Sequence, residues 1–497
     1  MNRILLSLLA ISFSVSIAYS QIDYANENYN IVIGDKIEDK SGEVIRFVAA
    51  DYIITVSQFN RASKIKSIAR YNREDFSNEW RVEIPKEIEY QKLDLVPDTC
   101  FFGDDGTCNI IAKGYDKKTD KVKFYHLSYD ADGKKSGLRF IGNMPLKDDK
   151  EFRCRYILSK EHIVIVGISD FTDKSDIQLS AIWADTSYEQ VGTISMEAFD
   201  KSSSFESVLY DEANHNLFVI MKMPFRSING IPLKRDSFMY KLGLDDKSTE
   251  KTELVFEDFK LYSNSLFKNE VNGDIMISAF AGEKNSTNMS ANALLHVNPK
   301  DLSIGGTKFF PIAAASVEKL KESKRFSEKM FTASNSASFN FRGSYYLEDG
   351  SFYLVYENTQ GMYHSGVYVL HFDKKNQLTW EDYIGNSGYG LSKIKLEYGE
   401  MKITSWVASK FMNTLFPEVD VFQDNTMYNQ AIMQFTIDRK STRYEIFCNI
   451  NSKGQQYYWY FLDEPKVVDG TKSIFANICF GNAVTLEKRV LAEIKRK

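Results

Sequence analysis

Residues 122–141 read VKFYHLSYDADGKKSGLRFI and contain two runs of strand-forming residues on either side of a short polar turn. The first run is rich in aromatic and β-branched side chains, which favour strands. The turn, Asp130-Ala131-Asp132-Gly133, holds the residue types that reverse the direction of a chain. The stretch therefore predicts an antiparallel β-hairpin.

The same hairpin pattern recurs seven times along the chain. The strand-like run before each turn ends, in order, at Tyr71, Tyr129, Ala184, Leu244, Val297, Phe372 and Ile437. The steps between these ends are 58, 55, 60, 53, 75 and 65 residues. Such a step is too long for one hairpin and fits a four-stranded antiparallel unit with its loops. A further apolar run precedes each hairpin, as expected for strands that are buried on both faces.

We therefore expect an all-β fold: a β-propeller of seven blades, each a four-stranded antiparallel sheet. Eight blades are the alternative, if the C-terminal runs 456–462 and 473–480 form a unit of their own. The strand-like run 29–33 should pair with the C-terminal blade and close the ring, because a closed ring removes exposed strand edges. The thin apolar stripe between residues 314 and 332 predicts a short helical insertion. A pair of β-sandwiches is the competing architecture, although no linker with a shift in composition divides the chain.

The N-terminus predicts export. Arg3 supplies a positive charge, residues 4–17 form an apolar stretch, and Ala18-Tyr19-Ser20 resembles a signal-peptidase cleavage site. We expect residues 1–20 to be a signal peptide and residues 21–497 to form one domain in the periplasm or outside the cell. A single N-terminal membrane anchor is the alternative reading of this stretch. No later segment is apolar over the roughly 18 residues that a transmembrane helix needs, so we expect no transmembrane helix in the mature chain.

The overall composition excludes one class of partner. The 497 residues carry a formal net charge of −5, and the charges are mixed along the chain. Binding to nucleic acid needs an excess of Lys and Arg to neutralise phosphates, so no nucleic-acid partner is expected. The aromatic fraction of 14% is high and agrees with a fold built from packed strands.

The five cysteines match no metal or redox motif, because such motifs place two thiols about two residues apart. Cys100 and Cys108 flank the turn Gly103-Asp104-Asp105-Gly106 and could meet across a hairpin. In an oxidising compartment the two could form a disulfide.

The sequence contains no pattern for a metal or cofactor site, and we expect neither. The six histidines include no His-x-x-x-His pair, and there is no Gly-x-Ser-x-Gly motif for a serine nucleophile. His126, His296 and His371 lie in strand-like runs, which favours structural roles. The Asp-rich and Gly-rich turns lack the run of oxygen ligands that calcium requires, so we interpret them as turn chemistry.

The loops between the second and third strands of each unit are longer and more varied than the other turns. Because long loops on a rigid scaffold commonly carry binding residues, they form the candidate binding face. The candidate binding residues are Arg226, Asn229, Lys234, Arg235, Asn285, Asn288, Tyr363 and His364.

The segment 343–357, GSYYLEDGSFYLVYE, together with residues 366–372 and Trp380, resembles secreted β-propeller-like proteins of uncharacterised bacterial families. The resemblance implies export and a propeller, and it implies no activity. We therefore expect an exported binding or interaction module that contacts an unknown protein or glycan through the long-loop face. The alternative is a hydrolase or lyase that acts on extracellular polysaccharide, and an enzyme is the less favoured of the two.

Overall fold

The structure, a computed structural model, describes residues between Tyr29 and Arg496. Apart from short interruptions, the segments left out are 59–64, 146–150, 171–177, 198–203, 323–338, 386–393, 410–428, 446–457 and 482–487. The predicted signal peptide, residues 1–20, lies outside the described residues. No helix in the described ranges is long and apolar enough to cross a membrane.

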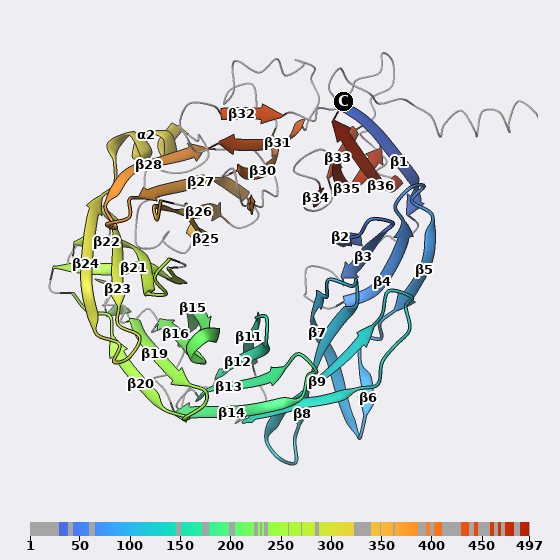
Figure 1. The fold of residues 1–497 in the computed structure, drawn as a ribbon, viewed down its shortest axis with the longest axis horizontal. Coiled ribbons are helices and arrows are strands. Elements are labelled where there is room, and N and C mark those ends of the chain that lie inside the picture. The colour runs from blue at the N-terminus through green and yellow to red at the C-terminus, as the bar shows by residue number, and fades with distance from the viewer. Residues whose placement is uncertain are drawn as a thin grey trace, which may run out of the picture.

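The described chain folds as an all-β propeller, in which eight sheets of four or five strands are arranged in a ring (Figure 1). Strands within a sheet pair antiparallel. In the sheets that begin with β2, β11, β15, β21 and β25, the first strand lies nearest the centre of the ring and the last lies at its rim (Figure 1).

The first four sheets follow one another along the chain, and the fourth is interrupted by a small two-stranded ribbon. The first sheet contains β2 (Glu43–Val48), β3 (Tyr52–Gln58), β4 (Ile65–Asn72) and β5 (Asn78–Glu83). The second contains β6 (Ile88–Tyr90), β7 (Leu93–Phe102), β8 (Cys108–Asp116), β9 (Lys121–Tyr129) and β10 (Arg139–Pro145). The third contains β11 (Glu151–Leu158), β12 (His162–Asp170), β13 (Gln178–Asp185) and β14 (Gln190–Glu197). The fourth contains β15 (Ser204–Asp211), β16 (Asn216–Lys222), β19 (Ser237–Gly243) and β20 (Thr249–Glu253), and the ribbon is β17 (Ser227–Ile228) with β18 (Ile231–Pro232).

The remaining sheets complete the ring. The fifth contains β21 (Phe259–Lys268), β22 (Ile275–Glu283), β23 (Ala291–Val297) and β24 (Ile304–Pro311). The sixth contains β25 (Phe339–Tyr346), β26 (Phe352–Gln360), β27 (Tyr363–Phe372) and β28 (Leu378–Gly385). The seventh contains β29 (Ile394–Glu397), β30 (Lys402–Ser409), β31 (Asn429–Thr436) and β32 (Thr442–Glu445). The closing sheet contains β33 (Tyr458–Phe461), β34 (Lys466–Val468), β35 (Ser473–Gly481), β36 (Lys488–Arg496) and the N-terminal β1 (Tyr29–Ile37).

The hairpins predicted from the sequence each lie in a sheet of their own, from the first sheet to the seventh. The closing sheet contains parts of the C-terminal runs 456–462 and 473–480, which the eight-blade alternative assigns to a unit of their own. Its rim strand is β1, which pairs with β36 from Tyr29 opposite Arg496 to Ile37 opposite Arg489. The predicted closure of the ring by an N-terminal strand is therefore observed. In the segment predicted as a helical insertion, α2 (Ala314–Glu322) is helical and residues 323–332 lie outside the described part.

The hydrophobic core lies between neighbouring sheets. One cluster joins Val164 and Trp183 of the third sheet to Val219 and Tyr240 of the fourth, and further clusters fill the neighbouring interfaces in the same way. The strands between two interfaces are buried on both faces: β22 is buried at every position except Glu283. This double burial explains why these strands are apolar at successive positions.

The first sheet packs against the closing sheet and contains an ion pair with a buried carboxylate. Leu491 of β36 packs in one cluster with Ile45, Ile53 and Tyr71. Glu43, which is 1% exposed, forms an ion pair with Arg81 and accepts hydrogen bonds from Thr55 Oγ1 (2.7 Å) and Tyr71 Oη (2.9 Å). A buried carboxylate is tolerated because these partners satisfy its charge.

Gly34 of β1 gives a direct test of ring closure. A Cβ atom at this position would lie 2.3 Å from Cβ of Phe76, a buried residue in the turn between β4 and β5 of the first sheet. We expect Gly34→Ala to destabilise the protein by about 1–3 kcal/mol, because the two sheets must move apart to admit a methyl group. Thermal unfolding followed by circular dichroism measures the effect.

Gly137 provides the matched control, because a Cβ there meets no atom within 4 Å. Gly137→Ala should leave the melting temperature unchanged or slightly raised. Equal melting temperatures for Gly34→Ala and Gly137→Ala would contradict the packing of β1 against the first sheet.

Candidate functional site

The two ends of the ring differ in the length of their loops. The turns between third and fourth strands are short and held by aspartate side chains. Oδ1 of Asp130, Asp185 and Asp373 each accepts hydrogen bonds from the backbone N–H groups two and four residues later. Asp246 and Asp301 each accept a bond from the N–H of a serine two residues later.

These hydrogen bonds support the interpretation of the Asp-rich motifs as turn chemistry. The bonds from Ser187 and from the N–H of Glu189 lower the pKa of Asp185, and those from the N–H groups of Gln377 and Lys375 lower the pKa of Asp373. A carboxylate that accepts backbone N–H bonds in this way is held in its charged form by the turn itself.

The opposite end carries the connections between second and third strands. The connection from β16 to β19 is long enough to contain the ribbon β17–β18, in which Ile228 pairs with Ile231. The strands β26 and β27 continue their pairing as far as Gln360 and Tyr363. The long connection from β16 to β19 agrees with the sequence prediction, whereas the loop expected around residues 358–365 is replaced by paired strands with a short connection.

Three of the candidate binding residues fall within the described part. Asn288 is exposed beside the end of β22, and Tyr363 and His364 form the start of β27, where they pair with Gln360 and Thr359. Residues outside the described part are Arg226, Asn229, Lys234, Arg235 and Asn285. Their role in binding remains a prediction.

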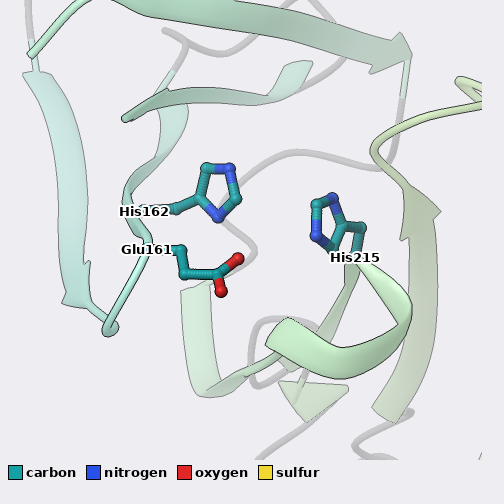
Figure 2. A group of neighbouring side chains, drawn as sticks. All are labelled: Glu161, His162 and His215. Atoms are coloured by element: carbon teal, nitrogen blue, oxygen red, sulfur yellow. The ribbon is translucent and has the colours of Figure 1, made fainter. Parts of the chain in front are cut away.

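A cluster at the end with the short turns was not anticipated. Glu161, His162 and His215 each offer one nitrogen or oxygen atom, and these atoms all lie within 4.8 Å of one another. Figure 2 shows the three side chains facing a common space. Glu161 and His162 stand at the turn from β11 to β12, and His215 stands in the turn from β15 to β16 of the next sheet.

A hydrogen bond between the two turns of this cluster joins them. Glu212 and Asn214 bound a single 3₁₀ turn, after which His215 adopts a left-handed conformation with φ of 48°. The backbone N–H of Glu161 donates a hydrogen bond of 2.8 Å to Oε1 of Glu212, which joins the third sheet to the fourth. The rings of His162 and His215 meet edge to face, with centroids 5.0 Å apart.

Sequence reasoning missed this cluster because His162 and His215 are far apart in the chain. A search for close His-x-x-x-His spacing cannot find residues on adjacent sheets. A usable signal exists once the repeat is known: both histidines follow the first strand of their unit, so the fold places them at the same end of neighbouring sheets.

Three further histidines, each in a strand, have structural surroundings. His126 of β9 is buried, stacks on Tyr188 with centroids 3.3 Å apart, and lies 3.0 Å through Nε2 from Oδ1 of Asn109. His371 stacks on Trp380 in the sixth sheet. His296 pairs through Nε2 with Oδ2 of Asp274 at 2.8 Å. The structural roles predicted for these three residues agree with these contacts.

Cys100 and Cys108 lie on the adjacent strands β7 and β8 and carry free thiols. A hydrogen bond from the thiol of Cys108 lowers the pKa of Cys100, and burial opposes it. The fold thus brings the predicted pair together without an S–S bond, and the disulfide stays a prediction.

No protein-family model matches the chain, and no curated protein sequence matches it. Among solved structures, the β-propeller domain of the Trilobed protease from Pyrococcus furiosus is 12% identical to this chain. The match covers 79% of this chain and 93% of that domain, with a TM-score of 0.35. The polysaccharide lyase Uly1 is 9% identical, and the match covers 96% of this chain and 93% of the lyase, with a TM-score of 0.33. A puromycin hydrolase mutant is 10% identical, and the match covers 88% of this chain and 58% of the hydrolase, with a TM-score of 0.37. At these TM-scores the likenesses carry no argument about function.

His126 predicts a pH-dependent loss of stability. Burial, and secondarily the charge of Arg139, lower its pKa to about 4, against about 6.5 in an unfolded chain. With Nε2 bonded to Asn109, a second proton would have to sit on Nδ1, which is buried and has no hydrogen-bond partner among the described residues. The folded state therefore binds the proton more weakly than the unfolded state does.

The stabilisation is fully present above pH 6.5 and is lost as the pH falls toward 4, by at most about 3 kcal/mol. His126→Gln, which keeps an N–H donor, should be less stable at pH 7 but should lose less stability between pH 6.5 and 4.5 than the wild type. Urea unfolding at several pH values measures this difference. Parallel losses in the two proteins would contradict the assignment.

The cysteine pair predicts a specific oxidation. On mild oxidation the intact chain should lose two hydrogens, detected by mass spectrometry, because the two thiols already touch. Cys154→Ser should still show this loss and Cys100→Ser should not. A loss that persists in Cys100→Ser would place the disulfide elsewhere.

Proposed function

We propose that the protein is an exported β-propeller that works as a binding module and contacts a protein or glycan partner through its long-loop end. The observation that carries the proposal is the difference between the two ends of the ring. One end consists of short turns closed by aspartate side chains, whereas the other carries longer connections, including the ribbon β17–β18. Loops that are free to vary on a rigid scaffold are the usual carriers of recognition.

The chemistry of the long loops suits recognition. By sequence, Arg226, Lys234 and Arg235 flank or follow the ribbon, and Tyr363 and His364 begin β27. Arginine and tyrosine are enriched among residues that dominate binding energy, because they combine apolar area with hydrogen-bonding groups.

Buried carboxylates near the inner strands support a scaffold role for the ring interior. Glu206 forms an ion pair with Lys222 at 2.8 Å and accepts a bond of 2.8 Å from Nδ2 of Asn264 in the next sheet. Glu357, fully buried, forms an ion pair with Arg342. A glycosidase-type mechanism would instead use two carboxylates on either side of the substrate, one of them protonated. Here each carboxylate is paired with a cation on the neighbouring strand of its own sheet, which fits a structural role.

A variant of the long-loop end tests the proposal. The mature protein should retain ligands from a glycan array or from a panel of extracellular proteins. Arg226→Ala, Arg235→Ala, Tyr363→Ala and His364→Ala combined should weaken that retention about tenfold or more, because each residue of a binding hot spot contributes more than about 1 kcal/mol.

The control is the double variant Lys134→Ala and Lys374→Ala, which removes two positive charges from exposed turns at the opposite end. It should bind as the wild type does. Equal binding by the wild type and the fourfold variant would refute the assignment of the binding face. Depolymerisation of an array polysaccharide by the wild type would favour the hydrolase or lyase alternative.

A further inference from the structure

The cluster of Glu161, His162 and His215 joins two sheets at the end opposite the proposed binding face. Two imidazoles and one carboxylate lie with their donor atoms within 4.8 Å of one another (Figure 2). His162 is 9% exposed, His215 is half-buried and Glu161 is exposed, so the cluster opens to solvent on one side. An ion could therefore enter without any opening of the fold.

The two turns hold the cluster in place before any ion arrives. Ser159 fixes the backbone of His162 from both directions: its N–H donates to the carbonyl of His162 at 2.9 Å, and its Oγ accepts from the N–H of His162 at 3.0 Å. The carbonyl of His215 accepts a bond of 2.9 Å from the N–H of Leu244. Ligands fixed in this way lose little conformational freedom on binding.

Neighbouring polar groups orient both imidazoles. Oδ1 of Asp245 lies 3.2 Å from Nδ1 of His215, and the hydroxyl of Tyr210 lies 3.3 Å from Nδ1 of His162. A carboxylate that accepts from a histidine ring is the typical outer partner of a metal ligand, since it fixes the ring and increases its basicity. Asp245 therefore fits the role of a positioning residue.

The electrostatic surroundings favour a cation. The carboxylate of Glu212 accepts from the N–H of Glu161, that of Asp245 lies beside His215, and Asp211 follows Tyr210 in the chain. Lys268 compensates one of these neighbours, because its Nζ lies 2.5 Å from Oδ1 of Asp211. The remaining negative charge is available to balance a divalent ion.

We propose that Glu161, His162 and His215 bind a divalent transition-metal ion, with zinc the best fit, and that the ion clamps the third sheet to the fourth. Two nitrogen ligands favour zinc-like ions over calcium and magnesium, which prefer oxygen ligands. Three protein ligands leave a fourth position for water, as in other sites with two histidines and a glutamate. At bond lengths of about 2.1 Å, tetrahedral ligand atoms lie about 3.4 Å apart, so ligand atoms that lie within 4.8 Å of one another would need to approach by about 1.4 Å at most.

Metal titration of the full chain tests the proposal. After treatment with a chelator, the wild type should bind one Zn²⁺ per chain in isothermal titration calorimetry. His215→Asn should weaken binding about 100-fold or more, and asparagine tolerates the left-handed backbone of this position. Asp245→Asn should weaken binding about 10- to 100-fold through loss of the outer carboxylate.

His296→Gln is the matched control, because His296 also pairs with a carboxylate, Asp274, but His296 is not part of the cluster. It should bind Zn²⁺ as the wild type does, and so should Cys100→Ser if thiols are not the ligands. Zn²⁺ should raise the melting temperature of the wild type but not that of His215→Asn, while the two proteins melt alike in chelator. Absence of saturable binding at one ion per chain, or equal affinity of the wild type and His215→Asn, would overturn the proposal.

Discussion

The pairing of β1 with β36 is the constraint on which the rest of the structure depends. Each sheet of the ring buries its two faces against its two neighbours, so a sheet is fully buried only when both neighbouring sheets are folded. A ring of sheets left open would expose two apolar faces and the strand edges beside them. The N-terminal strand removes this exposure by joining the C-terminal sheet, and the seam is then packed by Leu491 and Phe76.

This constraint explains the composition of the chain. The core of the described residues is divided among the interfaces between sheets, so large flat side chains are needed repeatedly. Phe280, Tyr356 and Tyr368 pack together between the fifth and sixth sheets, and Phe218 and Tyr240 are fully buried in the fourth. The aromatic surplus is therefore mainly a packing device, and it gives little support for an aromatic sugar-binding surface.

The repeat could be predicted from sequence because each unit carries its own local signals. Alternating and continuous apolar runs mark the strands, and turns such as Asp130 to Gly133 mark the hairpins, all within about 60 residues. The cluster of His162 and His215 could not be predicted in this way, because it depends on contact between neighbouring units. The fate of Cys100 and Cys108 shows the intermediate case: a local hairpin brings the two thiols together, but sequence does not say whether they are oxidised. The long loops carry no repeated sequence signal, so their binding residues could be proposed only from amino-acid type and loop position.

The closing pair also determines how the protein would respond to mechanical load. Tyr29 at the start of β1 lies opposite Arg496 at the end of β36, so both ends of the described chain leave the ring at the same point (Figure 1). In this antiparallel geometry, a force that separates the two ends acts on one hydrogen bond at a time, as a zipper opens. A shearing geometry would instead load all the bonds together. A closed propeller held between two tethers at its termini would therefore yield at its seam under low force, long before the sheets of the ring separate from one another.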